Sequence, residues 1–375
     1  MANSLTGLLP TLYEAVDTVS REMVGFIPAC TIDAKAENAA LHQSIMVPVT
    51  PAASAEDSVA SSLPPDSGDQ IIGNTQISIT QSKAVPFRWT GEEQKGINTG
   101  VGYANIQKDQ IAQAIRTLVN LVESDLAGTF TGASRAWGTA GTAPFASDLS
   151  DPAQVRKILM DNGSPMSDLQ LVIDTTAGAK VRSLANLTKA NEAGTTELRE
   201  QGKLLEIHGF KLRESAGIQV KSYVGTGIGY TLNGAHAKGA TVINAASGTG
   251  TIFAGDVVTI GGLKYVVQTT LAGGSFNINL PGLMGAQATG GTISVSPIFT
   301  PNYAFDRSSL VLAARQRAIP VEGDMASDRA YVTDPVSGLT FEFAMYKQYM
   351  RVRYEVALAW GVANIKPSHS ALLLG

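Results

Sequence analysis

Two segments of the chain carry apolar residues at the spacing of an α-helix. The first is residues 9–24, where one predicted face collects Leu9, Leu12, Val16, Val19 and Met23. A helix this short is marginal alone and needs a partner surface. The segment is therefore expected either to pack on its own domain or to lie as an arm on a neighbouring copy of the chain.

The second and stronger helical pattern covers residues 104–130. Its apolar stripe consists of Ile111, Ile115, Leu118, Val119, Val122 and Leu126, and its polar side of Gln110, Gln113, Asn120 and Glu123. At 1.5 Å per residue such a helix runs on the order of 35–40 Å, the length of a domain. We call it the spine helix.

Alternating and apolar runs indicate a long hairpin ahead of this helix. Residues 44–50 and 76–87 are predicted strands, and between them lies a polar, proline-containing run at 51–70. A projecting hairpin cannot bury both of its faces by itself. We therefore place candidate subunit contacts at Val47, Phe87 and Trp89.

The remainder alternates between mixed and purely β patterns. Predicted helices begin at Asp151 and Thr175, residues 131–150 and 188–203 are predicted loops, and strands are predicted at 169–174, 204–214, 218–220, 308–314 and across 340–362. This mixture indicates an α+β fold.

Residues 223–298 differ in composition from the segments on either side. They hold 16 of the 38 glycines and only three charged residues, Lys238, Asp256 and Lys264. Short β runs lie between glycine turns, and Gly261-Gly262 is a strong hairpin signal. The pattern predicts a small β-barrel or sandwich inserted into the surrounding α+β domain.

Composition and charge exclude several classes of function. Charged residues make up 16% of the chain and the net charge is −4, so a basic face for reading DNA is not expected. The single cysteine, Cys30, excludes an internal disulfide and reads as a buried apolar residue. No signal peptide and no run of about 18 apolar residues is present, so no membrane partner is expected.

Catalytic and metal-binding motifs are missing from the sequence. It contains no phosphate-binding loop of the G-x-x-x-x-G-K type, no H-E-x-x-H and no C-x-x-C, and its four histidines are scattered. Glu322, Asp324 and Asp328 form the one local acidic cluster, read as a solvated loop with a weak cation site as the alternative. We expect no enzyme activity, no cofactor and no metal.

The order of these parts resembles the Hong Kong 97-type capsid fold of tailed double-stranded-DNA phages. More closely, the chain resembles the coat protein family of the short-tailed Salmonella transducing phage. The resemblance rests on the start, LTGLLPTLYEAVDTVSREMVGFIPAC, on the tail, FEFAMYKQYMRVRYEVALAWGVANIKPSHSALLL, and on the β-rich insertion. It covers nearly the whole chain in order, although no short motif is diagnostic.

The resemblance implies a division of the chain into five parts. These are an N-terminal arm (1–45), an extended hairpin or E-loop (46–103), a P-domain with the spine helix (104–165 and 335–375), an A-domain (166–222 and 300–334) and an insertion domain (223–299). Some capsid proteins of this fold begin with a cleaved segment of about a hundred residues. None is expected here, because the arm pattern starts within ten residues of Met1.

The resemblance also implies a function and partners. The chain would be a major capsid protein that assembles as hexamers and pentamers into an icosahedral head, in the host bacterial cytoplasm, and ends in the virion. Its partners would be itself, a separate scaffolding protein, a portal and packaged double-stranded DNA contacted non-specifically. The alternatives are a tail-tube or decoration protein of the virion and an encapsulin-like compartment shell.

One prediction concerns the arm stripe of Leu12, Val16 and Val19. The double substitution Val16→Ala and Val19→Ala is expected to leave a folded subunit with impaired assembly, because it removes apolar area worth about 25 cal/mol per Å² at a contact. Circular dichroism reports folding, and electron microscopy reports shell yield. Thr18→Ala, off the stripe, is the control, and an unchanged shell yield in the double variant would contradict the prediction.

Overall fold

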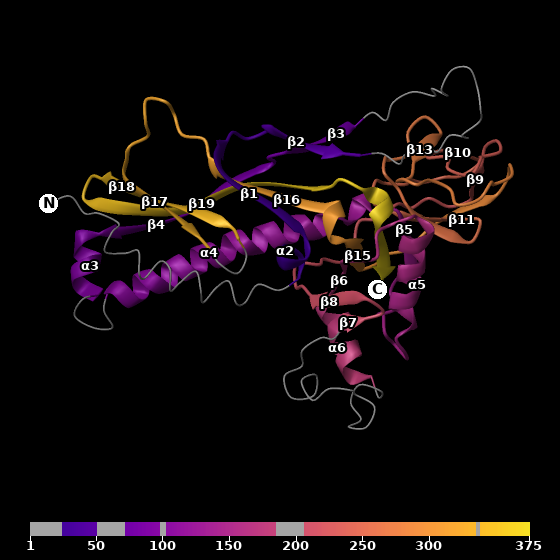
Figure 1. Cartoon of the computed structure of the whole chain (residues 1–375), viewed down its shortest axis with the longest axis horizontal. Coiled ribbons are helices and arrows are strands. Elements are labelled where there is room, and N and C mark those ends of the chain that lie inside the picture. Colours follow the sequence, from indigo (N-terminus) through magenta and orange to yellow (C-terminus); the bar gives the residue numbers. More distant parts are fainter. Residues whose placement is uncertain (1–24, 51–71, 98–102, 185–205, 335–337) are drawn as a thin grey trace, which may run out of the picture.

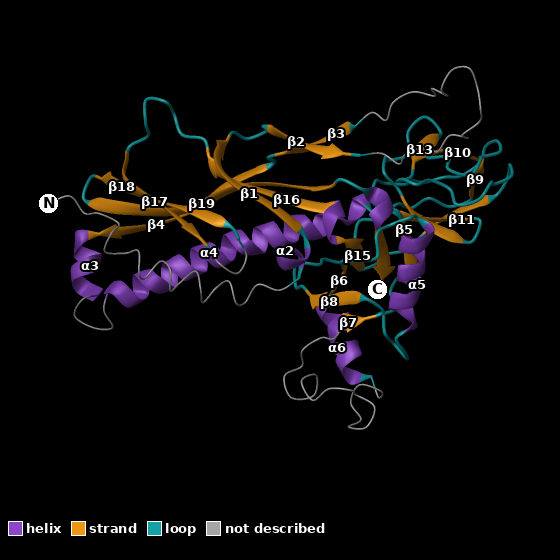
Figure 2. Ribbon diagram, in the orientation of Figure 1, coloured by secondary structure: helices purple, strands orange, loops and turns teal. Residues whose placement is uncertain are grey.

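The computed structural model describes residues 25–50, 72–97, 103–184, 206–334 and 338–375. The predicted helix at 9–24, with Leu12, Val16 and Val19, lies outside the described residues, as do the polar run 51–70 and the predicted loop at 188–203. Figure 1 shows a long helix beneath a sheet over one half of the molecule and a second, branching assembly of strands over the other half. Figure 2 shows the same view with the helices and the strands in different colours.

The spine helix is confirmed as α4 (Tyr103–Gly128). All six residues of the predicted apolar stripe, from Ile111 to Leu126, are buried in the main hydrophobic core. The predicted polar side is wrong at one position, because Glu123 is only 8% exposed. Sequence periodicity assigned it to solvent, but the start of the described chain covers it.

A six-stranded sheet lies over α4 (Figure 1). Its strands run in the order β1 (Thr31–Ala39), β16 (Leu310–Arg317), β19 (Arg351–Asn364), β18 (Thr340–Gln348) and β17 (Ala326–Thr333), and β4 (Gln81–Thr90) pairs with the other side of β19. Alternate residues of β18 and β19, such as Phe343, Tyr354 and Val356, face the helix as predicted. The Trp360 indole donates to Asp125 Oδ2 at 2.8 Å and joins sheet to helix.

The predicted hairpin is present as β2 (Ser44–Val49) and β3 (Gly73–Ser78). The single strand predicted at 76–87 is instead two strands, because the chain leaves the hairpin at Ile79 and enters the main sheet as β4. The crossing runs against β19, where a Cβ at Gly361 would overlap the Ser78 carbonyl. Glycine is needed at this position for the two backbones to approach.

Between β4 and α4 lies a short helix that the periodicity did not predict, α3 (Gly91–Ile97). Its start has reciprocal hydrogen bonds: the Thr90 N–H donates to Glu93 Oε2 at 2.8 Å, and the Glu93 N–H donates to Thr90 Oγ1 at 3.3 Å. This is a capping box that the sequence Thr90-Gly-Glu-Glu93 encodes.

The second sheet has twelve strands. Half of it joins β5 (Arg135–Gly138), β20 (Ser370–Leu374), β15 (Pro301–Asp306), β6 (Leu169–Ile173), β8 (Phe210–Glu214) and β7 (Glu206–Ile207). The helices α5 (Ser150–Asp161) and α6 (Thr175–Ser183) pack on these strands around a separate apolar cluster. β20 lies between β5, from the predicted P-domain, and β15, from the predicted A-domain, so this sheet joins strands of the two predicted domains.

Three local expectations for this region were wrong. Residues 131–150 are not all loop, since β5 pairs with β20 and β12. Within the strand predicted at 204–214, the described residues 206–214 form two strands around a tight turn with positive φ at His208 and Gly209. Residues 218–220 form no strand. For β5, pairing with two distant strands decides the outcome, and local sequence does not contain that information.

The predicted β insertion is confirmed as a barrel. Its strands run β13 (Ser275–Asn277), β10 (Val242–Ala246), β9 (Tyr230–Leu232), β14 (Thr292–Val295), β11 (Val257–Ile260) and β12 (Leu263–Val266). A bridge between Val267 and Ile278 returns from β12 to β13 and closes the ring. Gly261 and Gly262 form the predicted two-residue turn, both with positive φ.

The barrel has its own core and a separate contact with the rest of the chain. Val258, Ile260 and Phe276 belong to a cluster made only of barrel residues. The neighbouring Val257 and Val266 point the other way, into the main core beneath the first sheet. Side chains therefore alternate along β11 and β12 between the barrel core and the main core, so these two strands both form the barrel wall and attach the barrel to the rest of the chain.

The short elements at the sheet ends complete the chain. They are α2 (Phe26–Ala29), η2 (Thr129–Gly132), η3 (Arg307–Ser309) and η4 (Pro367–His369). The expected α+β fold class is confirmed. Hairpin, spine helix, mixed domain, inserted barrel and closing strands follow one another in the order that the resemblance to the Hong Kong 97-type capsid fold implies.

The separate core predicts that residues 226–297 fold as an isolated fragment with dispersed amide signals in an NMR spectrum. Phe276→Ala is expected to destabilise the fragment by about 3–5 kcal/mol, because it opens a cavity in the barrel core. Val257→Ala is the matched control: its side chain packs outside the barrel, so the fragment should change by less than about 0.5 kcal/mol. A collapsed spectrum for the unsubstituted fragment would show that the barrel depends on docking.

Candidate assembly surfaces

The β2–β3 hairpin lies over the first sheet on the face opposite α4 (Figure 1). Val47 and Ile45 are half-buried and pack toward Ile77, Ile79 and a small cluster on β16 and β19. Met46 points away and is 58% exposed. Val47 thus faces its own chain at this point, and its role in a subunit contact stays a prediction.

The other two candidate contact residues, Phe87 and Trp89, lie on β4 and pack in the main hydrophobic core. Phe87 is half-buried and stacks on Tyr354 with ring centroids 5.4 Å apart. Trp89 is buried, and its indole donates to Gln110 Oε1 on α4 at 2.8 Å. The structure therefore brings Phe87 and Trp89 together beneath the sheet and leaves Val47 apart. Their contribution to subunit contacts remains untested.

Large apolar side chains protrude at three separate turns. The six most exposed are Tyr223, Ile228, Val321, Met325, Tyr349 and Met350, each at least 73% exposed. They occupy the linker into the barrel, the β16–β17 loop and the β18–β19 turn. Single exposed apolar residues are common, but pairs concentrated at projecting turns are typical of contact sites. Sequence patterns missed them because turns have no periodicity.

The face of the first sheet opposite α4 carries paired charges. Arg317 binds Glu342 and Glu355, with nitrogen–oxygen distances of 3.4 and 2.7 Å, and Arg353 binds Glu355 at 2.5 Å. Glu342 and Glu355 are almost fully buried. Removing one member of such a network would leave a buried charge unpaired, which is strongly destabilising.

The acidic cluster seen in the sequence joins this network. Asp324 accepts from the Tyr346 hydroxyl at 3.0 Å and forms an ion pair with Arg329. Partial burial opposes ionisation, but these partners outweigh it and lower the pKa of Asp324. Arg329 and Tyr346 both bind Oδ2, and Oδ1 accepts from the Ala326 N–H at 3.3 Å, so Asp324 is a member of an ion-pair network.

No helix among the described residues is long and apolar enough to cross a membrane. Within the same ranges, no three His, Cys, Asp or Glu side chains cluster as a metal site would require.

Glu123 joins three parts of the chain at one point. Its Oε1 accepts from the Phe26 N–H at 2.8 Å and the Ser215 hydroxyl at 2.6 Å, and its Oε2 accepts from the Ile27 N–H at 3.2 Å. A Cβ at Gly25, where φ is +104°, would overlap this carboxylate. Burial raises the pKa of Glu123, and the three hydrogen bonds offset this only in part.

Cys30 comes directly after α2 (Phe26–Ala29) and is fully buried, as predicted. Burial raises the pKa of its thiol to about 12, and the thiol donates to the Ile27 carbonyl at 3.3 Å. Cys30 is therefore a packing residue at the root of the arm.

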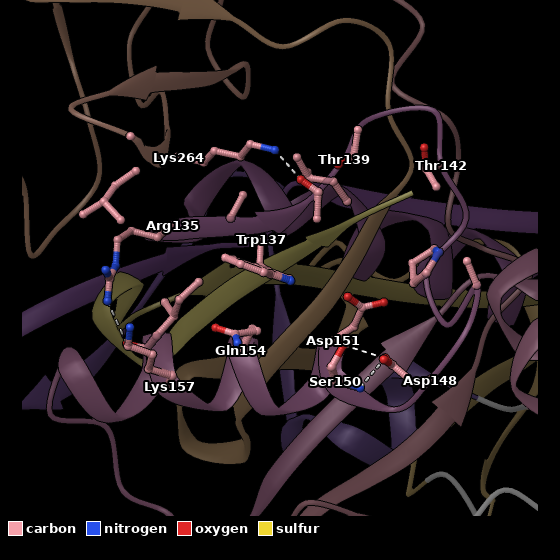
Figure 3. A pocket seen from close by; sticks show the side chains of 18 of the residues that line it. Arg135, Trp137, Thr139, Thr142, Asp148, Ser150, Asp151, Gln154, Lys157 and Lys264 are labelled. Carbon is pink, nitrogen blue, oxygen red and sulfur yellow. Dashed lines mark hydrogen bonds between the residues drawn. The ribbon is translucent and has the colours of Figure 1, made fainter. Parts of the chain in front are cut away.

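A pocket of about 600 Å³ lies where β5, α5 and the β11–β12 turn meet (Figure 3). Trp137 stands on its floor, 42% exposed, with Leu263 and Met284 on the barrel side. Asp148 and Asp151 lie at one end and Lys157 at the other. The volume is in the range of ligand sites, and the Ser150 hydroxyl in its lining donates to Asp148 Oδ1 at 2.5 Å.

Comparisons with known proteins are limited to three-dimensional structure. No protein-family model and no curated protein sequence matches the chain. A capsid structure of the cyanophage P-SCSP1u is similar at 10% identity and a TM-score of 0.49, covering 93% of this chain and 87% of that one. The mature capsid of bacteriophage PhiM1 is similar at 10% identity and a TM-score of 0.48, covering 93% and 86%.

A third solved structure is a virus-like particle from Pyrococcus furiosus. It is 9% identical, has a TM-score of 0.48 and covers 98% of this chain and 99% of that one.

The raised pKa of Glu123 predicts a pH dependence of stability. Its ordinary pKa is 4.5, so its stabilising contribution is fully present below that pH and is lost as the pH rises through the higher folded-state pKa. Glu123→Gln cannot ionise. The melting temperature of the wild type minus that of Glu123→Gln should therefore fall from about pH 4 to about pH 8.

The control for this experiment is Glu322→Gln, at an exposed loop position. It should show a flat difference over the same range. A flat or rising difference for Glu123→Gln would contradict a raised pKa at the buried carboxyl.

Proposed function

We propose that this chain is the major capsid protein of a tailed double-stranded-DNA phage, assembling as hexamers and pentamers into an icosahedral head. One observation carries the proposal: a thin sheet is backed by a single 26-residue helix, with a projecting hairpin on the opposite face. A subunit built this way exposes much of its secondary structure at its edges. Such elements need neighbours to become buried.

The distribution of exposed apolar residues supports a shell. They lie on several distant turns rather than in one patch, which suits a subunit with many separate neighbours. Each contact can then be weak, because closing a shell makes later contacts effectively intramolecular. The same surfaces must also serve in rings of different size, which favours projecting turns over one rigid interface.

The closer resemblance to the coat protein family of the short-tailed Salmonella transducing phage is part of the proposal. The barrel enters the chain between β8 and β15, inside the predicted A-domain, where that family is expected to carry its extra domain. We retain the five-part division of the chain, with the N-terminal arm at 1–45 and the E-loop at 46–103.

The expected partners follow from the same function. They are further copies of the chain, a scaffolding protein, a portal and packaged DNA, with assembly in the bacterial cytoplasm and a final location in the virion. The exposed side of α4 carries Gln113, Thr117, Asn120 and Ser124, with Arg116 as the one cation among them. A surface with a single cation would hold DNA only weakly, since phosphate binding depends on the number of lysine and arginine contacts. The role is structural and not catalytic.

Electron microscopy of the purified protein tests this function. Closed shells of uniform size are expected. Tubes or open rings would favour a tail-tube protein, and shells whose neighbouring genes and cargo are those of a compartment would favour an encapsulin-like role.

A soluble monomer would prompt the same imaging after co-expression with the neighbouring genes, which would supply a scaffold. A chain that stays monomeric under both conditions would contradict the proposal.

A further inference from the structure

The turn between β18 and β19 exposes two large side chains that the fold does not require. Tyr349 is 93% exposed and Met350 is 73% exposed, at the tip of a two-residue hairpin turn. Met350 has φ of +57°, a conformation that glycine or asparagine adopts with less strain. Exposed apolar side chains and a positive φ at Met350 both cost free energy in the isolated subunit. Residues kept at such a cost point to a role outside the subunit.

The composition of this turn is that of a protein contact. Tyrosine, methionine and arginine are enriched at interface cores, and Tyr349, Met350 and Arg351 follow one another directly. Lys347 and Arg351 are both exposed beside the tip, which therefore carries positive charge. The tip is an apolar knob with a cationic base.

The pocket of Trp137 has the complementary chemistry. Its apolar wall is formed by Trp137, Leu263 and Met284, and Asp148 and Asp151 stand at one end (Figure 3). The Ser150 hydroxyl and amide hydrogen-bond to Asp148 and hold its pKa below the ordinary value, so this carboxylate stays charged.

The deeper cations of the pocket are already engaged within the chain. Arg135 donates to the Ile158 carbonyl and Lys264 to the Gly138 carbonyl. Lys157 stands at the end opposite the aspartates. The aspartate end is therefore the one open to a cation from outside.

We propose that the Tyr349–Met350 tip of one copy docks in the Trp137 pocket of a second copy, with Arg351 at the aspartate end. The contact rests on the proposed function of self-assembly. Tip and pocket cannot meet within one chain: Arg351 pairs with Thr90 beside α3, whereas the pocket lies on α5, at the other end of the molecule (Figure 1). The contact is head-to-tail, and head-to-tail contacts propagate into rings or lattices.

Cysteine crosslinking tests the contact directly, because Cys30 is buried and leaves introduced cysteines as the accessible thiols. Assembled particles of the double variant Tyr349→Cys, Trp137→Cys are treated with a short bismaleimide. A ladder of crosslinked multimers is expected, since every chain carries both partners. The matched control is Val321→Cys with Trp137→Cys, a fully exposed position on another turn, which should give no ladder.

The outcomes separate the contact from the proposed function. Shells without a ladder, or an equal ladder in the control, would overturn the contact and leave the capsid function standing. Dimers from Tyr349→Cys alone would show that tips meet tips, which also overturns it. Absence of any oligomer of the unsubstituted protein, also after co-expression with the neighbouring genes, would overturn both.

A charge exchange provides a second measurement that does not disturb Trp137. Arg351→Glu is expected to lower the shell yield at least tenfold, and adding Asp148→Arg should restore most of it. Both residues are exposed in the single chain, and circular dichroism of each variant checks its folding, because Asp148→Arg also removes the two hydrogen bonds from Ser150. Failure of Asp148→Arg to rescue the yield would count against the contact.

Discussion

The packing of α4 against one face of the six-stranded sheet is the contact on which the rest of the structure depends. It buries the whole apolar stripe of the helix together with alternate residues of β18 and β19. The contact also fixes two segments that are distant in sequence, since Glu123 holds the segment after Gly25 and Asp125 holds Trp360. With this single helix covering one face, the opposite face is left for the hairpin and the ion-pair network.

The two faces of the six-stranded sheet are therefore stabilised by different interactions. The helix face is stabilised by apolar burial, which is tolerant of small shifts and roughly proportional to area. The opposite face, around Arg317, Glu342 and Glu355, is held by ion pairs that lose far more when one partner is removed.

Periodic elements could be predicted from the sequence and contacts between distant strands could not. The spine helix, the glycine turn at Gly261-Gly262 and the β character of the insertion follow from spacing and turn chemistry alone. The burial of Glu123 does not, because its partners lie about ninety residues away on either side. β5 was missed for the same reason, and so was the division of 76–87, which depends on the close approach at Gly361. For the candidate subunit contacts, the sequence identified apolar residues, but it could not show that Trp89 is buried in the subunit's own core while Tyr349 is exposed.

The closure of the barrel has a consequence for how such a protein survives at high copy number. An open sheet presents unpaired N–H and C=O groups at its edges, and these groups recruit strands from other chains into aggregates. The bridge between Val267 and Ile278 removes both edges from the insertion. A glycine-rich unit with only three charges would otherwise be poorly protected against misassembly during synthesis. Ring closure supplies that protection through backbone pairing, without the surface charge that most soluble proteins use.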